Sequence, residues 1–152
     1  MSLFFIVLAE SLGEPSAIDI TRDNEIENIG TVSKDKLTFC HLKKMIWSQK
    51  PKFFSKVDYD VDELILWKVE DLSDGNYKWK LLEKSPTKID IKRQLGGEKL
   101  SSTRSVSVAF PDVPADSIHI LVQPPKPATT GKCLPMVYLS NKKFALSHIF
   151  FY

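Results

Sequence analysis

The sequence predicts an α+β fold in which a mixed sheet of four or five short strands wraps over one helix. Short β-branched and aliphatic runs, bounded by turn-forming residues, indicate several buried strands. One segment between them has the apolar spacing of an amphipathic helix. The chain has 152 residues, of which 43% are hydrophobic and 26% are charged. This length and composition suit one folded domain and argue against wholesale disorder.

The first predicted hairpin lies near the N-terminus. Leu3–Ala9 is an unbroken apolar run, typical of a central strand, and Ala17–Thr21 alternates apolar and polar residues like a half-exposed partner. Residues 11–16 contain Gly, Pro and Ser and form the turn region. Leu3–Ala9 also has the length of a short signal-peptide core, but no basic residue precedes it and Glu10 follows at once. We therefore expect a strand, with a cleaved signal as the alternative.

A helix is predicted from Phe39 to about Lys50, after a polar segment, Asn24–Lys36, that we interpret as a loop. Thr38 is a suitable N-cap because its hydroxyl accepts a hydrogen bond from an unpaired amide of the first turn. Pro51 ends the helix, since proline disfavours helical geometry at the preceding residue. Three apolar residues share the face that should cover the sheet: Phe39, Leu42 and Ile46.

Two further strands are predicted in the second half of the chain. Glu63–Val69 has the composition of a largely buried strand, and Ile118–Val122 is stopped by prolines, which cannot donate to a ladder. Residues 71–97 are expected to form a short fourth strand or a long loop with apolar anchors. Residues 95–111 are expected to form a helical turn or an irregular packed segment, anchored by four apolar residues: Leu100, Val106, Val108 and Phe110.

The order strand, strand, helix, strand, variable segment, strand is that of a ubiquitin-like β-grasp roll. Two segments also resemble a known family. His119, Ile120, Leu121, Val122 and Pro125 occupy the places of a His-Val-Leu-Val-x-x-Pro motif. The run ELILWKVED, which begins at residue 63, is similar to a strand that recurs in the same proteins. On these residues, the chain resembles the N-terminal header domain of Crinkler effectors, secreted proteins of oomycetes and some fungi.

The resemblance implies a non-enzymatic domain that is secreted and delivered into a host cell, with toxic activity in a second domain that follows it. The translocation motif of the family is Leu-x-Leu-Phe-Leu-Ala-Lys. Here Leu64 and Leu66 match it and Trp67 takes the Phe place, whereas Lys68 and Val69 replace Leu-Ala. Fungal members of the family commonly show such a Leu-Trp-Lys-Val version. The resemblance implies a protein partner, which the sequence does not identify, and no cofactor.

A ubiquitin-like domain of this family is expected to span residues 1–125, and residues 126–152 to form a linker and a short tail. A large effector domain follows in the family, so we interpret this tail as the remnant of a truncated chain. Net charge is +2 overall, which leaves no electrostatic footprint for nucleic acid. It divides unevenly, with −2 on residues 1–125 and +4 on the tail. No apolar run reaches the ~20 residues of a membrane helix.

Patterns that would indicate catalysis or a metal site are weak. Cys40 and His41 suggest a nucleophile and base, but adjacent helical residues point about 100° apart and no third orienting group is visible. The acidic run at residues 58–63 lacks the glycine and final glutamate of a calcium loop. Gly96-Gly97 does not stand at a free carboxyl terminus, as conjugation of a ubiquitin-like modifier requires. We expect no catalytic residue and no metal.

Three further points concern contacts and a rival function. His119 is expected on the outer face of its strand, because Ile118 and Ile120 would share the helix-covered face. Trp47 lies off the apolar helix face and is interpreted as core or rim packing, with an exposed contact as the alternative. A disulfide between Cys40 and Cys133 stays open. The rival function is an intracellular ubiquitin-like adaptor that binds a partner through its sheet.

Overall fold

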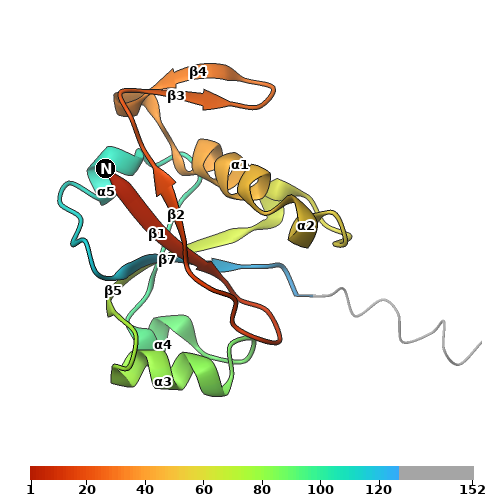
Figure 1. Ribbon diagram of the computed structural model, residues 1–152, viewed down its shortest axis with the longest axis vertical. Coiled ribbons are helices and arrows are strands. Elements are labelled where there is room, and N and C mark those ends of the chain that lie inside the picture. The colour runs from red at the N-terminus through yellow and green to blue at the C-terminus, as the bar shows by residue number, and fades with distance from the viewer. Residues whose placement is uncertain (127–152) are drawn as a thin grey trace, which may run out of the picture.

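The structure is a computed structural model that describes residues 1–126, and it confirms the predicted α+β class with a ubiquitin-like β-grasp arrangement. A five-stranded mixed sheet lies between helices (Figure 1). Its order is β2-β1-β7-β5-β6, with β1 parallel to β7 and the other neighbours antiparallel. The strands are β1 (Ser2–Val7), β2 (Ser16–Asp19), β5 (Ile65–Leu72), β6 (Glu98–Lys99) and β7 (Ile118–Gln123).

The apolar run at the N-terminus forms the strand that its composition predicted. β1 pairs with β2 on one side, where Leu3 lies opposite Ile18, and with β7 on the other, where Phe5 lies opposite Ile120. Leu3, Phe5 and Ile6 are each only 1% exposed. A strand that is covered on both faces of its sheet has a continuous apolar sequence, which explains the lack of alternation.

The segment predicted to be a loop, Asn24–Lys36, instead contains a separate hairpin of β3 (Asp23–Ile26) and β4 (Gly30–Ser33), followed by the 3-10 turn η1 (Lys34–Lys36). The prediction was wrong because only two side chains of β3 are buried. Asn24 is one of them, and its amide donates to the carbonyl oxygens of Thr21 and Val32 at 3.0 and 3.2 Å. Ile26 is the other, and it packs in the core between the sheet and helix α1 (Phe39–Gln49).

Helix α1 confirms the predicted start and buried face, and Thr38 is its N-cap residue. Phe39, Leu42 and Ile46 are fully buried. Lys43 is buried as well, although it is charged: it is only 6% exposed, and its Nζ donates to the Asp62 carbonyl oxygen at 2.9 Å. Two short elements follow α1, namely α2 (Pro51–Phe54) and the 3-10 turn η2 (Val61–Glu63).

The segment 71–97 contains two helices, α3 (Tyr77–Lys84) and α4 (Ile91–Leu95), so the expectation of a fourth strand or loop there was wrong. Each helix has an Asx N-cap: Asn76 Oδ1 accepts from the Trp79 amide at 2.8 Å, and Asp90 Oδ1 from the Arg93 amide at 3.0 Å. The short strand β6 lies just beyond them. The predicted helical turn is α5 (Val106–Ala109), although Val108 is 67% exposed and is not an anchor.

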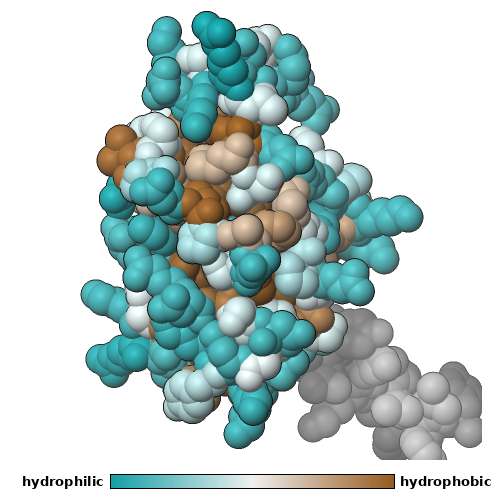
Figure 2. Space-filling model, turned by 60° about the vertical axis from the view of Figure 1, so that its left-hand side comes forward, coloured by the Kyte–Doolittle hydropathy of each residue, from teal (hydrophilic) through white to brown (hydrophobic). Residues whose placement is uncertain are grey.

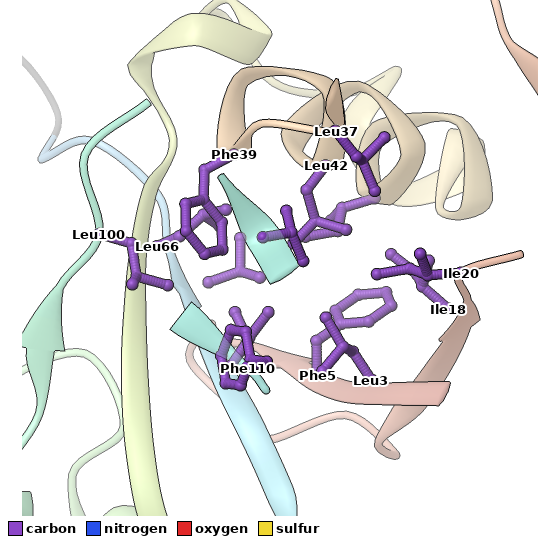
Figure 3. Packing of buried hydrophobic residues seen from close by; sticks show 14 of the residues in the cluster. Leu3, Phe5, Ile18, Ile20, Leu37, Phe39, Leu42, Leu66, Leu100 and Phe110 are labelled. Carbon is purple, nitrogen blue, oxygen red and sulfur yellow. The ribbon is translucent and has the colours of Figure 1, made fainter. Parts of the chain in front are cut away.

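The sheet is therefore covered on both faces. The first core lies between the sheet and α1, where aromatic and aliphatic side chains from the strands meet those of the helix (Figure 3). The second core lies between the opposite face and the pair α3 and α4. Its fully or nearly fully buried members are Ile6, Leu8, Val69, Leu72, Leu82, Ile91, Leu95, Ile118 and Leu121. The sequence predicted the first core and not the second.

Candidate functional site

The structure brings the two family-like motifs together as neighbouring antiparallel strands. Leu66 lies opposite Val122, and Lys68 lies opposite Ile120. The indole Nε1 of Trp67 donates to the side-chain oxygen of Gln123 at 2.9 Å, which adds a side-chain link across the same pair of strands. Two segments separated by about fifty residues in sequence thus form the middle of one sheet.

Most side chains of the two motifs belong to the cores. Leu64, Leu66, Val69, Ile120, Leu121 and Val122 are at most 3% exposed. Trp67, Lys68 and Pro125 are half-buried. Lys68 extends over the Phe110 ring, with its Nζ 5.4 Å from the ring centroid and 3.7 Å from a Glu70 carboxylate oxygen. Trp67 and Lys68 of the translocation-like motif thus keep some exposed surface, and as neighbours on a strand they lie on opposite faces of the sheet.

His119 is buried, 4% exposed, so its expected place on the outer face was wrong. The register between β5 and β7 shifts between Lys68 and Leu72, and β7 loses strict alternation opposite this irregularity. Consequently Ile118 packs in the second core while Ile120 packs in the first. The imidazole lies between the rings of Phe4 and Phe110, with centroids 6.1 and 6.4 Å away.

Both ring nitrogens of His119 have backbone partners. Nδ1 accepts from the Phe4 amide at 3.1 Å, and Nε2 lies 2.8 Å from the Pro114 carbonyl oxygen, to which it donates. This assigns a neutral tautomer with the proton on Nε2. Burial lowers the pKa of His119 below its ordinary value, and the hydrogen bond to Pro114 opposes that change. The side chain joins β7 to β1 and to the preceding loop, which is a structural role.

Cys40 and His41 do not form a nucleophile–base pair. His41 Nδ1 accepts from the Thr38 backbone amide at 3.2 Å and lies 3.1 Å from the Thr38 hydroxyl. The imidazole thus occupies the place that Glu or Gln takes in a capping box. Cys133 lies outside the described residues, so its pairing with Cys40 is untested.

Trp47 and the Gly96-Gly97 pair have structural roles, in side-chain packing and in ending a helix. Trp47 stacks on Phe54 with ring centroids 4.3 Å apart, which confirms rim packing. Gly96 has the positive φ of 68° that a helix C-cap uses, and a Cβ on Gly97 would lie 2.6 Å from Ile91 Cγ2. Residues 1–126 contain no group of three or more His, Cys, Asp or Glu side chains arranged to hold a metal ion. Within the same range, no helix has the length and apolar character needed to cross a membrane.

Comparison with known proteins agrees with the fold and the motifs. The family described as Crinkler effector protein N-terminal domain matches residues 1–123. Crinkler effector protein 1 of Rhizophagus irregularis is 31% identical over 106 residues. That alignment covers 69% of this chain and 20% of the relative, so the chain spans about a fifth of the curated protein it matches. No solved structure gives a significant match.

Proposed function

Because the chain belongs to the Crinkler effector N-terminal domain family, we propose that it serves as the delivery domain of a secreted effector and directs that effector into a host cell. The family match over almost the whole described domain carries this proposal. The position of the last strand supports it, since β7 ends at Gln123 and the chain leaves the sheet through Pro124 and Pro125. A module attached beyond this point would leave the β-grasp fold intact.

The proposed delivery domain works without catalysis. Support comes from the two described histidines, both of which are engaged in holding backbone: His41 at the start of α1 and His119 between β1 and the loop before β7. The same reasoning applies to Glu63 in the acidic run before β5, whose Oε2 accepts from the Asp60 amide at 2.7 Å. These groups have the structural partners expected of caps and turns.

The rival function, an adaptor that binds through its sheet, has less support. Leu82, Ile91 and Leu95 of α3 and α4 pack on the sheet face that lies opposite α1. A ubiquitin-like protein that binds through an open sheet face needs that surface free. Here a partner would have to displace a packed core, so we propose the delivery function in preference.

A secretion and uptake assay tests the proposal. The full chain is fused to one fragment of a split luciferase and expressed in a fungal cell, while a co-cultured host cell carries the other fragment in its cytosol. We expect luciferase activity from the host cell, together with fusion protein in the medium. Fusion protein that stays inside the producing cell would contradict the proposal and favour the adaptor.

Charge-reversal variants locate the surface that delivery uses. Lys68→Glu changes the half-buried cation of the translocation-like motif, and Lys92→Glu makes the same charge change on the exposed side of α4. At equal amounts of secreted fusion protein, we expect Lys68→Glu to lower the host-cell signal more than Lys92→Glu does. The melting temperature of Lys68→Glu should also fall, because Lys68 packs over Phe110 and pairs with Glu70. Equal signals from the two variants would show that Lys68 is not part of a delivery surface.

A further inference from the structure

One face of the domain exposes apolar surface that is framed by hydrophilic side chains (Figure 2). The structure also contains a groove of about 440 Å³ beside α3, at the end of the sheet where β5 finishes and β7 begins. Its apolar lining combines side chains from four elements: Phe4, Leu72, Trp79 and Ile118. Phe4 and Trp79 are half-buried, so two aromatic rings are accessible to a ligand.

The groove has a negative rim. Asp74, Glu83 and Asp116 line it, whereas no Lys, Arg or His of residues 1–126 does. Throughout that described range, none of the three carboxylates lies within 4.0 Å of a basic group. Glu83 accepts a hydrogen bond from the Trp79 Nε1 at 2.8 Å, which holds the indole beside the carboxylates. Asp74 and Asp116 are exposed and have no such internal partner in the same range.

We propose that this groove is a docking site for a basic segment of a partner protein, in which a bulky apolar side chain stands between Lys or Arg residues. The apolar side chain packs against Phe4 and Trp79. The flanking cations pair with Asp74 and Asp116, and an Arg can also lie over the indole face. The proposal stands on the groove itself and does not depend on the delivery role.

The acidic rim of the groove favours a basic protein segment over other occupants. A nucleic acid would bring phosphates to an acidic rim and would be repelled. A purely apolar peptide would leave the carboxylates unpaired, and a small cation alone would leave the aromatic floor open to water. The combination of an aromatic floor with unpaired carboxylates therefore fits a segment that carries both kinds of side chain.

Fluorescence anisotropy on the full chain tests the proposal. The probe is a fluorescein-labelled peptide with the core Lys-Arg-Phe-Lys-Arg between Gly-Ser spacers, and the control peptide has Ser in place of Phe. We expect saturable binding of the Phe peptide and clearly weaker binding of the Ser peptide, which carries the same charge. Equal binding of the two peptides, or no binding of either, would overturn the proposal.

Two double variants of equal net charge place the binding in the groove. Asp74→Asn with Asp116→Asn removes two rim charges, whereas Asp35→Asn with Asp58→Asn removes two exposed charges elsewhere. The groove variant should bind the Phe peptide about five-fold more weakly, because exposed ion pairs contribute only modestly to affinity. Equal weakening in both variants would assign binding to overall charge and overturn the proposal.

The chain's own basic tail is the remaining rival for the groove. Lys142→Gln with Lys143→Gln removes two of its positive charges in the full chain. Peptide binding that is unchanged in this variant supports a partner segment as the occupant. Binding that appears only in this variant would overturn the proposal and indicate that the tail itself occupies the groove.

Discussion

The two faces of the sheet are covered in different ways. On one face, the 11-residue α1 places Phe39, Leu42 and Ile46 over a large core. On the other face, the 8-residue α3 and the 5-residue α4 cover a smaller one. Helices this short are not stable alone, so α3 and α4 depend on the sheet that they cover. The first core defines the β-grasp fold, while the second closes the remaining sheet face and leaves the acidic groove beside α3.

Leu66→Ala probes the first core and should have the largest effect. Leu66 is fully buried on a strand paired with neighbours on both sides. Removing its side chain should lower the free energy of unfolding by about 2–5 kcal/mol, the range for an aliphatic truncation in a packed core. Urea unfolding followed by circular dichroism measures this change. A loss below about 0.5 kcal/mol would contradict the assignment of Leu66 to the core.

Leu82→Ala makes the same truncation in the second core, where the side chain is also fully buried. We expect a loss of about 2 kcal/mol, at the lower end of the range, because a short helix can shift to fill part of the cavity. The same urea experiment compares the two variants. A loss greater than that of Leu66→Ala would show that the second core, and not the first, dominates stability.

Gly97→Ala tests how closely α4 approaches the sheet. The added Cβ would stand 2.6 Å from Ile91 Cγ2 and 3.2 Å from the Ile91 carbonyl oxygen, so the second core must shift. We expect a loss of about 1–2 kcal/mol from overpacking. Gly13→Ala is the matched control, since nothing lies within 4 Å of the position that its Cβ would take. Equal melting temperatures for the two variants would contradict this close approach.

His119 should give the smallest effect, seen as a dependence of stability on pH. Its folded-state pKa is lowered by burial, so the unfolded chain binds a proton at a higher pH than the folded domain. This contribution to stability is complete above pH ~6.5 and is lost as the pH falls from there toward the folded-state pKa.

The variant His119→Gln removes this titration and should keep the fold. Its thermal melting temperature should fall less between pH 7 and pH 5 than that of the wild type. An equal fall in melting temperature between pH 7 and pH 5 for the two proteins would contradict the neutral, buried state of His119. Loss of cooperative melting in the variant would show that the imidazole is indispensable to the fold.

Sequence patterns predicted the elements whose signal is strong and local. The apolar spacing of Phe39, Leu42 and Ile46 and the cap at Thr38 indicated α1, and continuous apolar runs indicated β1, β5 and β7. The hairpin β3–β4 escaped prediction because Asn24, a polar residue, takes one of its two buried positions. The helices α3 and α4 escaped because Gly75-Asn76 and Pro86 are typical of loops, although Asn76 and Asp90 are caps.

The candidate groove was less predictable than the fold. Asp74 and Trp79 are close in sequence, but Asp116 and Phe4 come from distant parts of the chain, and only the packing of α3 beside the start of β7 brings all four together. The burial of His119 could not be predicted from the sequence either. The register shift between Lys68 and Leu72 changes the faces on which Ile118 and His119 were expected. Such irregularities depend on tertiary packing and leave no period in the sequence.

Amide hydrogen exchange on the full chain tests whether the two family-like motifs form the centre of the folded domain. If they do, the paired amides of β5 and β7 exchange only through global unfolding, with a free energy equal to that from urea melts. The amides of α3 should exchange through a smaller opening, because that helix covers the lesser core. Exchange of β5 and β7 as fast as α3 would contradict the account, and would indicate that the motifs are exposed segments rather than core strands.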